Sequence, residues 1–445
     1  MKRLFEEKIN NKAVFFAGAS FAAELPICAA AAVFYHRAIW FGAALILLSA
    51  CAFIFGRAAS YPGFCAFCAA AAAAFGVIAL FLRGYFRVLL LFTLSFVFAA
   101  AGLFILIIHK QKGSLKKLPL KQICAAFLIV AIALPLALGW FPDPLFRFAM
   151  QGGVMSHTPS PSDSVREDGV RVIEDIEYPS AYPNNTMTLR LAPENLGTLF
   201  FVHGGGFVLG DKTMADNSYF RMWLDEGFNV VSFDYALAPQ YRVDIQLIQC
   251  SQALRFFMEH AQEWGIDRGR VFLVGESAGG CLAGLLASAG VSPGLAGRLG
   301  VPDAPEYGSE ICGFISAGGL VDVTRFGDTN DDLSSWAFNL MGVSAFHSPA
   351  YAESDTAELF SVLAGVTADF PPSYLSDGNH GTFTGQAKDL AVKLRSLGVR
   401  VETNFIPAVS GRRGHVFELN PDTDPLALEN FNKTLSFVKE ILSLR

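Results

Sequence analysis

Residues 273–280 read Leu-Val-Gly-Glu-Ser-Ala-Gly-Gly, and they contain a Gly-x-Ser-x-Gly pattern from Gly275 to Gly279. The pattern follows the apolar run Val271–Val274 and precedes a stretch of small and apolar residues. This succession predicts a strand, a sharp turn and a helix, with Ser277 at the turn. Glycines at both ends of such a turn avoid clashes with the neighbouring backbone, so the Ser277 hydroxyl is expected to project from the edge of a sheet.

A second motif lies upstream, where the apolar run Thr198–Val202 continues into His203-Gly204-Gly205-Gly206-Phe207. Consecutive glycines after a strand leave backbone N–H groups free to approach a ligand. Acyl transfer needs such donors at the oxygen that becomes negative in the tetrahedral intermediate. The sequence therefore predicts an oxyanion hole, formed by the backbone amides of Gly205, Gly206 and Ala278.

Three motifs together carry a resemblance to a known family. Residues His203–Phe207, Asp234–Pro239 (Asp-Tyr-Ala-Leu-Ala-Pro) and Gly275–Gly280 resemble the hormone-sensitive-lipase-like esterases of the α/β-hydrolase fold. Ala236 and Glu276 depart from the family, which usually has Arg and Asp at these positions. The likeness runs from about Val170 to the C-terminus. It implies hydrolysis of carboxylic esters by a Ser-His-Asp triad, with no metal or organic cofactor.

A serine hydroxyl is a poor nucleophile unless a neighbouring imidazole takes its proton. The triad order in this fold is Ser, acid, His, which leaves three later histidines as candidates. His415 stands in Gly-His-Val-Phe after a glycine-containing loop and resembles the family's catalytic histidine. His380 is the alternative, although it falls where the acid is expected. His203 is expected to hold the glycine loop rather than act as a base.

The acid is the least regular part of the pattern. The family places its Asp a few residues past a glycine at the end of the next-to-last strand. Matching that glycine to Gly378 puts the acid near Gly381, where the chain has no carboxylate. Asp377, at the end of the expected strand 371–376, is therefore the preferred acid. Asp322 is an alternative, and a triad without a strong acid is another.

The first 141 residues differ in composition from the remainder. Five apolar runs each approach the ~20 residues that cross ~30 Å of hydrocarbon, which predicts an all-α membrane domain of about five transmembrane helices. A cleaved signal peptide would explain only one run. Glu24 lies inside the first run, and the sequence assigns it no function. Cys65 and Cys68 are interpreted as small apolar residues rather than as a metal or redox pair. The five runs lie near residues 14–34, 38–56, 63–82, 86–108 and 122–141.

Lysine and arginine in the short connections set the expected orientation. The N-terminus and the connections after the second and fourth runs are expected on the same side of the membrane, and together they carry ten of these residues. The connections expected on the opposite side carry three. The positive-inside rule then places the N-terminus in the cytoplasm, and five spans place Ser277 outside the plasma membrane. Residues 142–445 hold 21 Lys and Arg against 37 Asp and Glu, a formal charge of −16. This balance argues against nucleic acid and against docking on anionic lipid.

The chain is thus expected to divide into a membrane domain over residues 1–141, a Pro- and Ser-containing linker or mobile entry segment over 142–168, and an α/β-hydrolase catalytic domain over 169–445. Alternating strands and helices in the catalytic domain predict a doubly wound, mostly parallel sheet with a short antiparallel start. The segment 324–370 is expected to be an insertion that covers the pocket or packs on the sheet.

The sequence predicts a membrane-anchored serine carboxylesterase whose partners are an ester substrate and the lipid bilayer. One alternative uses the same acyl-enzyme to transfer the group to a sugar or lipid hydroxyl. Another is a non-catalytic ligand-binding sensor on the same fold, which the irregular acid site would suit.

Overall fold

A single nine-stranded sheet organises the domain that the structure, a computed structural model, describes over residues 159–444. The strand order is β1-β2-β3-β5-β4-β6-β7-β8-β9, in which the first four strands pair antiparallel and the remainder pair parallel. The strands are β1 (Ser162–Val165), β2 (Arg171–Glu177), β3 (Thr186–Leu191), β4 (Gly197–Val202), β5 (Phe228–Phe233), β6 (Val271–Glu276), β7 (Ile311–Ala317), β8 (Ser373–Asp377) and β9 (Val401–Phe405).

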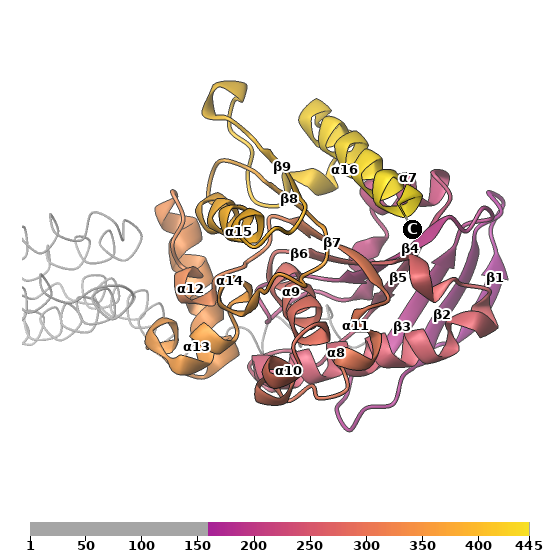
Figure 1. The fold of residues 1–445 in the computed structure, drawn as a ribbon, viewed down its shortest axis with the longest axis horizontal. Coiled ribbons are helices and arrows are strands. Elements are labelled where there is room, and N and C mark those ends of the chain that lie inside the picture. Colours follow the sequence, from indigo (N-terminus) through magenta and orange to yellow (C-terminus); the bar gives the residue numbers. More distant parts are fainter. Residues whose placement is uncertain (1–158, 445) are drawn as a thin grey trace, which may run out of the picture. The chain divides into compact units, whose positions relative to one another are not determined.

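Helices cover both faces of the sheet, with α7 and α16 on one side and α8 and α9 on the other (Figure 1). The α-helices are α7 (Ser218–Asp225), α8 (Val243–His260), α9 (Ala278–Gly290), α10 (Pro293–Leu299), α11 (Pro305–Gly308), α12 (Asp332–Phe346), α13 (Asp355–Leu359), α14 (Val362–Gly365), α15 (Thr384–Ser396) and α16 (Pro425–Ser443). Parallel strands covered on both faces are apolar along their whole length, and β4, β5 and β6 are buried at every position.

The core under α7 and α16 is largely aromatic. Trp223 of α7 is fully buried, and its ring packs edge-on against Phe228 of β5 and against Phe431 of α16. Phe201, Phe272 and Val274 belong to the same cluster, whereas Phe200, the neighbour of Phe201, packs against Phe257 of α8 on the other face. These contacts hold α7 and α16 against the central strands, whose carboxyl ends lead into the glycine loop and the Ser277 turn.

Strand register brings the two glycine motifs together. Val202 at the end of β4 pairs with Gly275 near the end of β6, so the loops that follow the two strands leave the sheet side by side. Glu276 pairs in turn with Ala317 of β7, whose neighbour on β8 is Ser376. The carboxyl ends of parallel strands are where open α/β sheets place ligand sites.

The expected mostly parallel sheet with an antiparallel start is confirmed. Within the segment predicted as a linker or entry segment, residues 162–165 form β1, which pairs antiparallel with β2. The chain itself divides after Pro142, close to the predicted boundary. The five predicted spans, with Glu24, Cys65 and Cys68, lie outside the described residues. Within residues 159–444, no helix is long and apolar enough to cross a bilayer.

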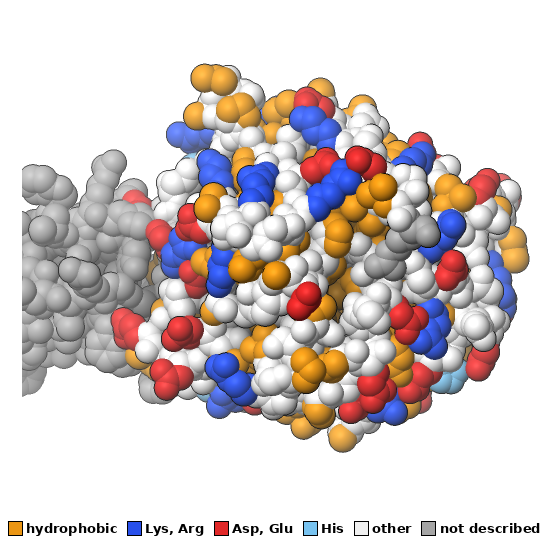
Figure 2. All heavy atoms as spheres, in the orientation of Figure 1, with side chains coloured by type: hydrophobic (Ala, Val, Ile, Leu, Met, Phe, Trp, Pro, Cys, Tyr) orange, Lys and Arg blue, Asp and Glu red, His pale blue; other side chains and the backbone are white. Residues whose placement is uncertain are grey.

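Segment 324–370 contains α12, α13 and α14, and α12 and α13 lie together at one end of the domain (Figure 1). The surface shown in Figure 2 intersperses acidic and basic side chains among neutral and apolar ones. This mixed face shows no broad basic patch of the kind that binds nucleic acid.

Candidate active site

Ser277 occupies the turn between β6 and α9. Its φ of 53° and ψ of −124° are a strained combination for a residue with a side chain. The surrounding glycines make this turn possible: a Cβ on Gly279 would lie 2.0 Å from the carbonyl oxygen of Val202, and one on Gly275 would lie 2.3 Å from that of Gly279. The Ser277 side chain therefore stands at the amino end of α9, next to the end of β4.

His415 lies against the serine. Its Nε2 is 2.8 Å from Ser277 Oγ, which is hydrogen-bond distance for a nucleophile and its base. The half-buried imidazole is walled by the rings of Phe338 and Phe383, with centroids 5.2 and 5.0 Å away. Desolvation in this setting lowers the pKa of His415 to about 4, so the ring is neutral at pH 7 and able to accept a proton.

The other ring nitrogen of His415 meets a hydroxyl rather than a carboxylate. His415 Nδ1 is 2.9 Å from Oγ1 of Thr382, and the Thr382 hydroxyl donates a 2.5 Å hydrogen bond to Oδ1 of Asp377. Asp377 was expected to orient His415 itself. Within the described residues no hydrogen bond or ion pair joins the two side chains, and Thr382 stands between them.

Thr382 is the site residue that sequence reasoning missed. The family pattern already pointed to the neighbourhood of Gly381 for the acid, and Thr382 is the next residue. A search for any hydrogen-bonding side chain there, rather than a carboxylate alone, would have found it. Burial raises the pKa of Asp377, which is fully buried at the end of β8, while the Thr382 hydroxyl acts in the opposite direction.

The alternative residues have other partners. Asp322 caps a short 3-10 helix, accepts from the backbone N–H of Thr324 at 3.1 Å and forms an ion pair with Arg325 at 2.6 Å. His380 lies 3.8 Å from Asp331, and its backbone N–H donates to the carbonyl of Arg413. Neither side chain contacts His415 or Ser277 through a hydrogen bond in the described part of the chain.

The glycine loop after β4 has the backbone that an oxyanion hole requires. Gly205 and Gly206 have φ of +96° and +62°, values that favour glycine, and their N–H groups have no hydrogen-bond partner among residues 159–444. The same holds for the N–H of Ala278 within those residues. The structure thus brings the three predicted donors to the carboxyl ends of neighbouring strands.

Two side chains hold this loop. Glu276 is buried and accepts a 2.7 Å hydrogen bond from the N–H of Gly204; burial raises its pKa to about 7. The Tyr235 hydroxyl donates to the carbonyl of His203 at 2.7 Å, and the two rings stack with centroids 4.2 Å apart. His203 is buried there, with Nδ1 on the carbonyl of Gly204, so it is a structural residue of the loop.

Helix α12 covers the site. A Cβ on Gly206 would lie 2.2 Å from the sulfur of Met341, so this side chain rests directly on the oxyanion loop. Phe338, one turn earlier, contacts the His415 ring. The expected covering role of segment 324–370 therefore rests on α12.

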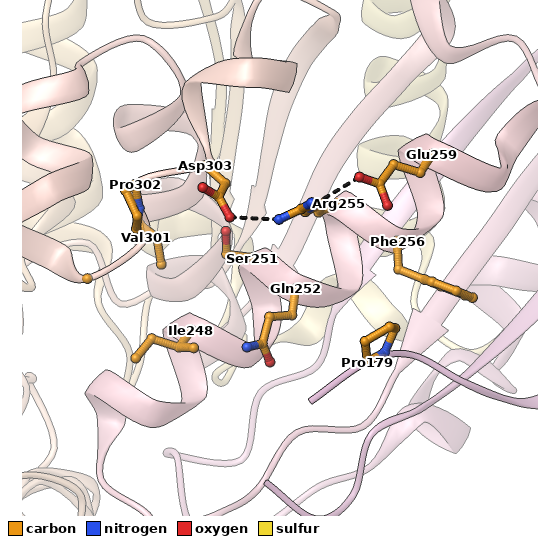
Figure 3. Close-up of a pocket in the computed structure, with 11 residues that line it drawn as sticks. Pro179, Ile248, Ser251, Gln252, Arg255, Phe256, Glu259, Val301, Pro302 and Asp303 are labelled. Atoms are coloured by element: carbon orange, nitrogen blue, oxygen red, sulfur yellow. Dashed lines mark hydrogen bonds and ion pairs between the residues drawn. The ribbon is translucent and has the colours of Figure 1, made fainter. Parts of the chain in front are cut away.

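A separate hollow of about 380 Å³ is lined by residues of α8, by Pro179 and by residues 300–303 (Figure 3). Its Arg255 is paired with Glu259 at 2.9 Å and with Asp303 at 2.8 Å. None of its lining residues comes from the oxyanion loop, the Ser277 turn or the His415 loop. Across residues 159–444 no cluster of three His, Cys, Asp or Glu side chains could hold a metal ion.

Comparison with known proteins agrees with the fold of this domain. A family model described as alpha/beta hydrolase fold matches residues 199–417. Esterase B of Lactobacillus rhamnosis superimposes with a TM-score of 0.54 at 22% identity, covering 71% of this chain and 96% of the esterase. The domain has the α/β-hydrolase fold.

Curated relatives carry the names of ester hydrolases. Lipase 2 of Moraxella sp. is 27% identical over 241 residues, which is 50% of this chain and 55% of the lipase. Ethyl acetate hydrolase of Pseudomonas putida is 38% identical over 90 residues, which is 20% of this chain and 28% of that enzyme. This α/β-hydrolase chain therefore spans about half or less of the length of the relatives it matches.

Proposed function

We propose that this chain is a membrane-anchored serine carboxylesterase that works through an acyl-serine intermediate. The 2.8 Å contact between Ser277 Oγ and His415 Nε2, at a strained strand–helix turn, carries the proposal. The names of the relatives, among them an acetyl esterase of Salmonella at 34% identity over 24% of this chain, support a carboxylic ester as the substrate. Esterase B has also been solved in a form inhibited by a tributyrin phosphonate, which superimposes with a TM-score of 0.53.

The reaction follows from the contacts. Ser277 Oγ attacks the ester carbonyl carbon while its proton passes to Nε2 of His415. The carbonyl oxygen becomes negative and accepts hydrogen bonds from the amides of Gly205, Gly206 and Ala278; losing one such donor costs about 3–4 kcal/mol of barrier. The intermediate collapses, and His415 returns the proton to the departing alcohol.

Deacylation repeats the sequence with water. His415 takes a proton from the water as its oxygen attacks the acyl carbon, and then gives that proton to Ser277 Oγ as the carboxylic acid leaves. The positive imidazolium that forms twice in each cycle is stabilised by Asp377. No cofactor takes part in this scheme.

The membrane part of the proposal comes from the sequence. Five apolar runs in residues 1–141 and the distribution of ten against three basic residues support a cytoplasmic N-terminus and an external catalytic domain at the plasma membrane. The bilayer is then the second partner of the chain. Its ester substrate is met outside the cytoplasm.

A membrane-impermeant fluorophosphonate probe on intact cells tests chemistry and orientation together. Wild type is expected to label and Ser277→Ala is not, while Ser410→Ala, an exposed serine, serves as the matched control and labels like wild type. Labelling only after lysis would contradict the external position of the catalytic domain but would still support a reactive Ser277. A folded wild type that never labels would contradict the proposed enzymatic activity and favour a ligand-binding sensor.

Product analysis in the presence of competing alcohols separates hydrolysis from acyl transfer.

A further inference from the structure

We propose that Thr382 is the positioning residue of the catalytic histidine, and that Asp377 acts on His415 only through the Thr382 hydroxyl. The inference rests on the proposed function and deepens its mechanism. It replaces a three-residue triad by a four-residue chain, Ser277–His415–Thr382–Asp377. The three contacts along this chain measure 2.8, 2.9 and 2.5 Å.

The direction of each hydrogen bond follows from counting protons. The Thr382 hydroxyl donates its single proton to Oδ1 of Asp377, which is the acceptor in this contact. The Thr382 oxygen must then accept from His415 Nδ1, which therefore carries the ring proton. The neutral ring has one proton, so Nε2 keeps its lone pair and faces the Ser277 hydroxyl.

The opposite tautomer is costly in this arrangement. With the ring proton on Nε2, Nδ1 would need a donor, and the Thr382 hydroxyl would have to turn away from the carboxylate to supply it. That turn gives up the 2.5 Å hydrogen bond to Asp377 Oδ1 and leaves this buried oxygen without its hydroxyl partner, which is costly. Asp377 thus selects the reactive tautomer of His415 without touching it.

Because Thr382 and Asp377 are buried, water cannot easily take the place of the Thr382 hydroxyl between His415 and Asp377. Thr382 is 6% exposed and Asp377 is 0% exposed, so solvent has little access to either group. The loop is also held on both sides of Thr382: the N–H of Gly381 donates to Asn330 Oδ1 at 2.7 Å, and the Thr384 hydroxyl donates to the carbonyl of Gly378 at 2.6 Å. The hydroxyl is therefore fixed in place before substrate binds.

A double-mutant cycle on the full chain tests the inference, with p-nitrophenyl acetate as the probe substrate. Thr382→Val keeps the shape and removes the hydroxyl, so kcat is expected to fall about 100-fold with little change in KM. Thr382→Ser is expected to restore kcat to within about threefold of wild type. Because Asp377 acts through the hydroxyl, Asp377→Asn should add less than about threefold in the Thr382→Val background.

Asp322→Asn is the matched control, since it alters a helix-capping carboxylate that forms no hydrogen bond with Thr382 or His415 in the described residues. Its kcat is expected to stay within about threefold of wild type. Additive losses from Thr382→Val and Asp377→Asn would overturn the inference, because they would mean that Asp377 acts independently of the hydroxyl. A Thr382→Val variant with wild-type kcat would overturn it as well.

The ring tautomer gives a second measurement that does not depend on turnover. Nitrogen-15 spectra of histidine-labelled protein are expected to show His415 protonated at Nδ1 in wild type and Thr382→Ser, and a mixture of tautomers in Thr382→Val. An unchanged tautomer in Thr382→Val would overturn the inference. If wild type neither labels with fluorophosphonate nor turns over, the proposed function fails while this measurement still decides the role of Thr382.

Discussion

The environment of His415 governs how the proposed reaction responds to pH. The aromatic walls formed by Phe338 and Phe383 desolvate the ring and lower its pKa to about 4, well below the ordinary 6.5. The rate depends on the neutral ring, so we expect kcat/KM for p-nitrophenyl acetate to decline only below about pH 5. A decline with a midpoint near 6.5 would show that the ring is solvated when the enzyme is free.

The same shift affects folding. Between about pH 4 and 6.5 the unfolded chain binds a proton at His415 and the folded chain does not, so the contribution of this group to stability is lost as the pH falls through that range. Measurements at low pH should therefore be restricted to conditions in which the tryptophan fluorescence of the folded protein is retained.

Glu418 is expected to change the free energy of unfolding with pH in the direction opposite to His415. Its side chain is fully buried, and burial together with the nearby charge of Asp377 raises its pKa. As the pH rises from 5 to 8, the unfolded chain releases this proton before the folded chain does, so the free energy of unfolding falls. We expect Glu418→Gln to be more stable than wild type at pH 8, by on the order of 2 kcal/mol, and less sensitive to pH.

Urea unfolding followed by tryptophan fluorescence at pH 5 and pH 8 measures this difference. Glu429→Gln is the matched control, because Glu429 is exposed in an ion pair with Lys433 and its loss should change stability by less than about 1 kcal/mol. Equal pH dependence in Glu418→Gln and wild type would contradict the prediction.

Residues differ in how far the sequence reveals them. Ser277 was predictable because its conformation is set by glycines within two positions of it, and His415 because the motif around it is local. The link between His415 and Asp377 depends on Thr382, whose hydroxyl is common in any sequence and acquires meaning only when β8, the following loop and the His415 loop are folded together. A pattern that required a carboxylate could find Asp377 but not the hydroxyl that stands between it and His415.

At the scale of elements, α12 lies over the proposed reacting groups, and we expect it to limit the space for the acyl group. The sequence predicted an insertion over residues 324–370, but its helix and its facing side chains follow from packing rather than from spacing. Met341 rests on Gly206 of the oxyanion loop and Phe338 on His415. If the ester carbonyl binds at the amides of Gly205 and Gly206 as proposed, a side chain of this size beside them would limit the length of the acyl chain.

Met341→Ala is therefore expected to shift preference toward longer acyl chains. The ratio of kcat/KM for p-nitrophenyl octanoate to that for the acetate should rise about tenfold, within the range that a few methylene groups contribute in an apolar pocket. Leu333→Ala, on the exposed side of the same helix at 57% exposure, should leave the ratio unchanged. An unchanged ratio in Met341→Ala would mean that the acyl chain leaves the site along another path.

The whole molecule combines two parts of different composition. The chain divides after Pro142, and the sheet and all the site residues belong to the second part. The sequence indicated this division because apolar runs without charge are concentrated before residue 142, while the net charge of the remainder is −16. The groups named in the proposed reaction all lie in the second unit, so we expect that unit to react with a serine probe when it is expressed alone.

We therefore expect the full chain to remain in the membrane pellet after alkaline carbonate extraction, since five apolar spans would hold it in the bilayer. Residues 143–445 expressed alone should appear in the supernatant and still label with fluorophosphonate, and Ser277→Ala in the same fragment should not label. Full-length protein released by carbonate would contradict membrane anchoring. A fragment that stays folded but does not label, beside a full chain that does, would show that residues before 143 contribute directly to the reactive serine, and the two-part description of the molecule would then be wrong.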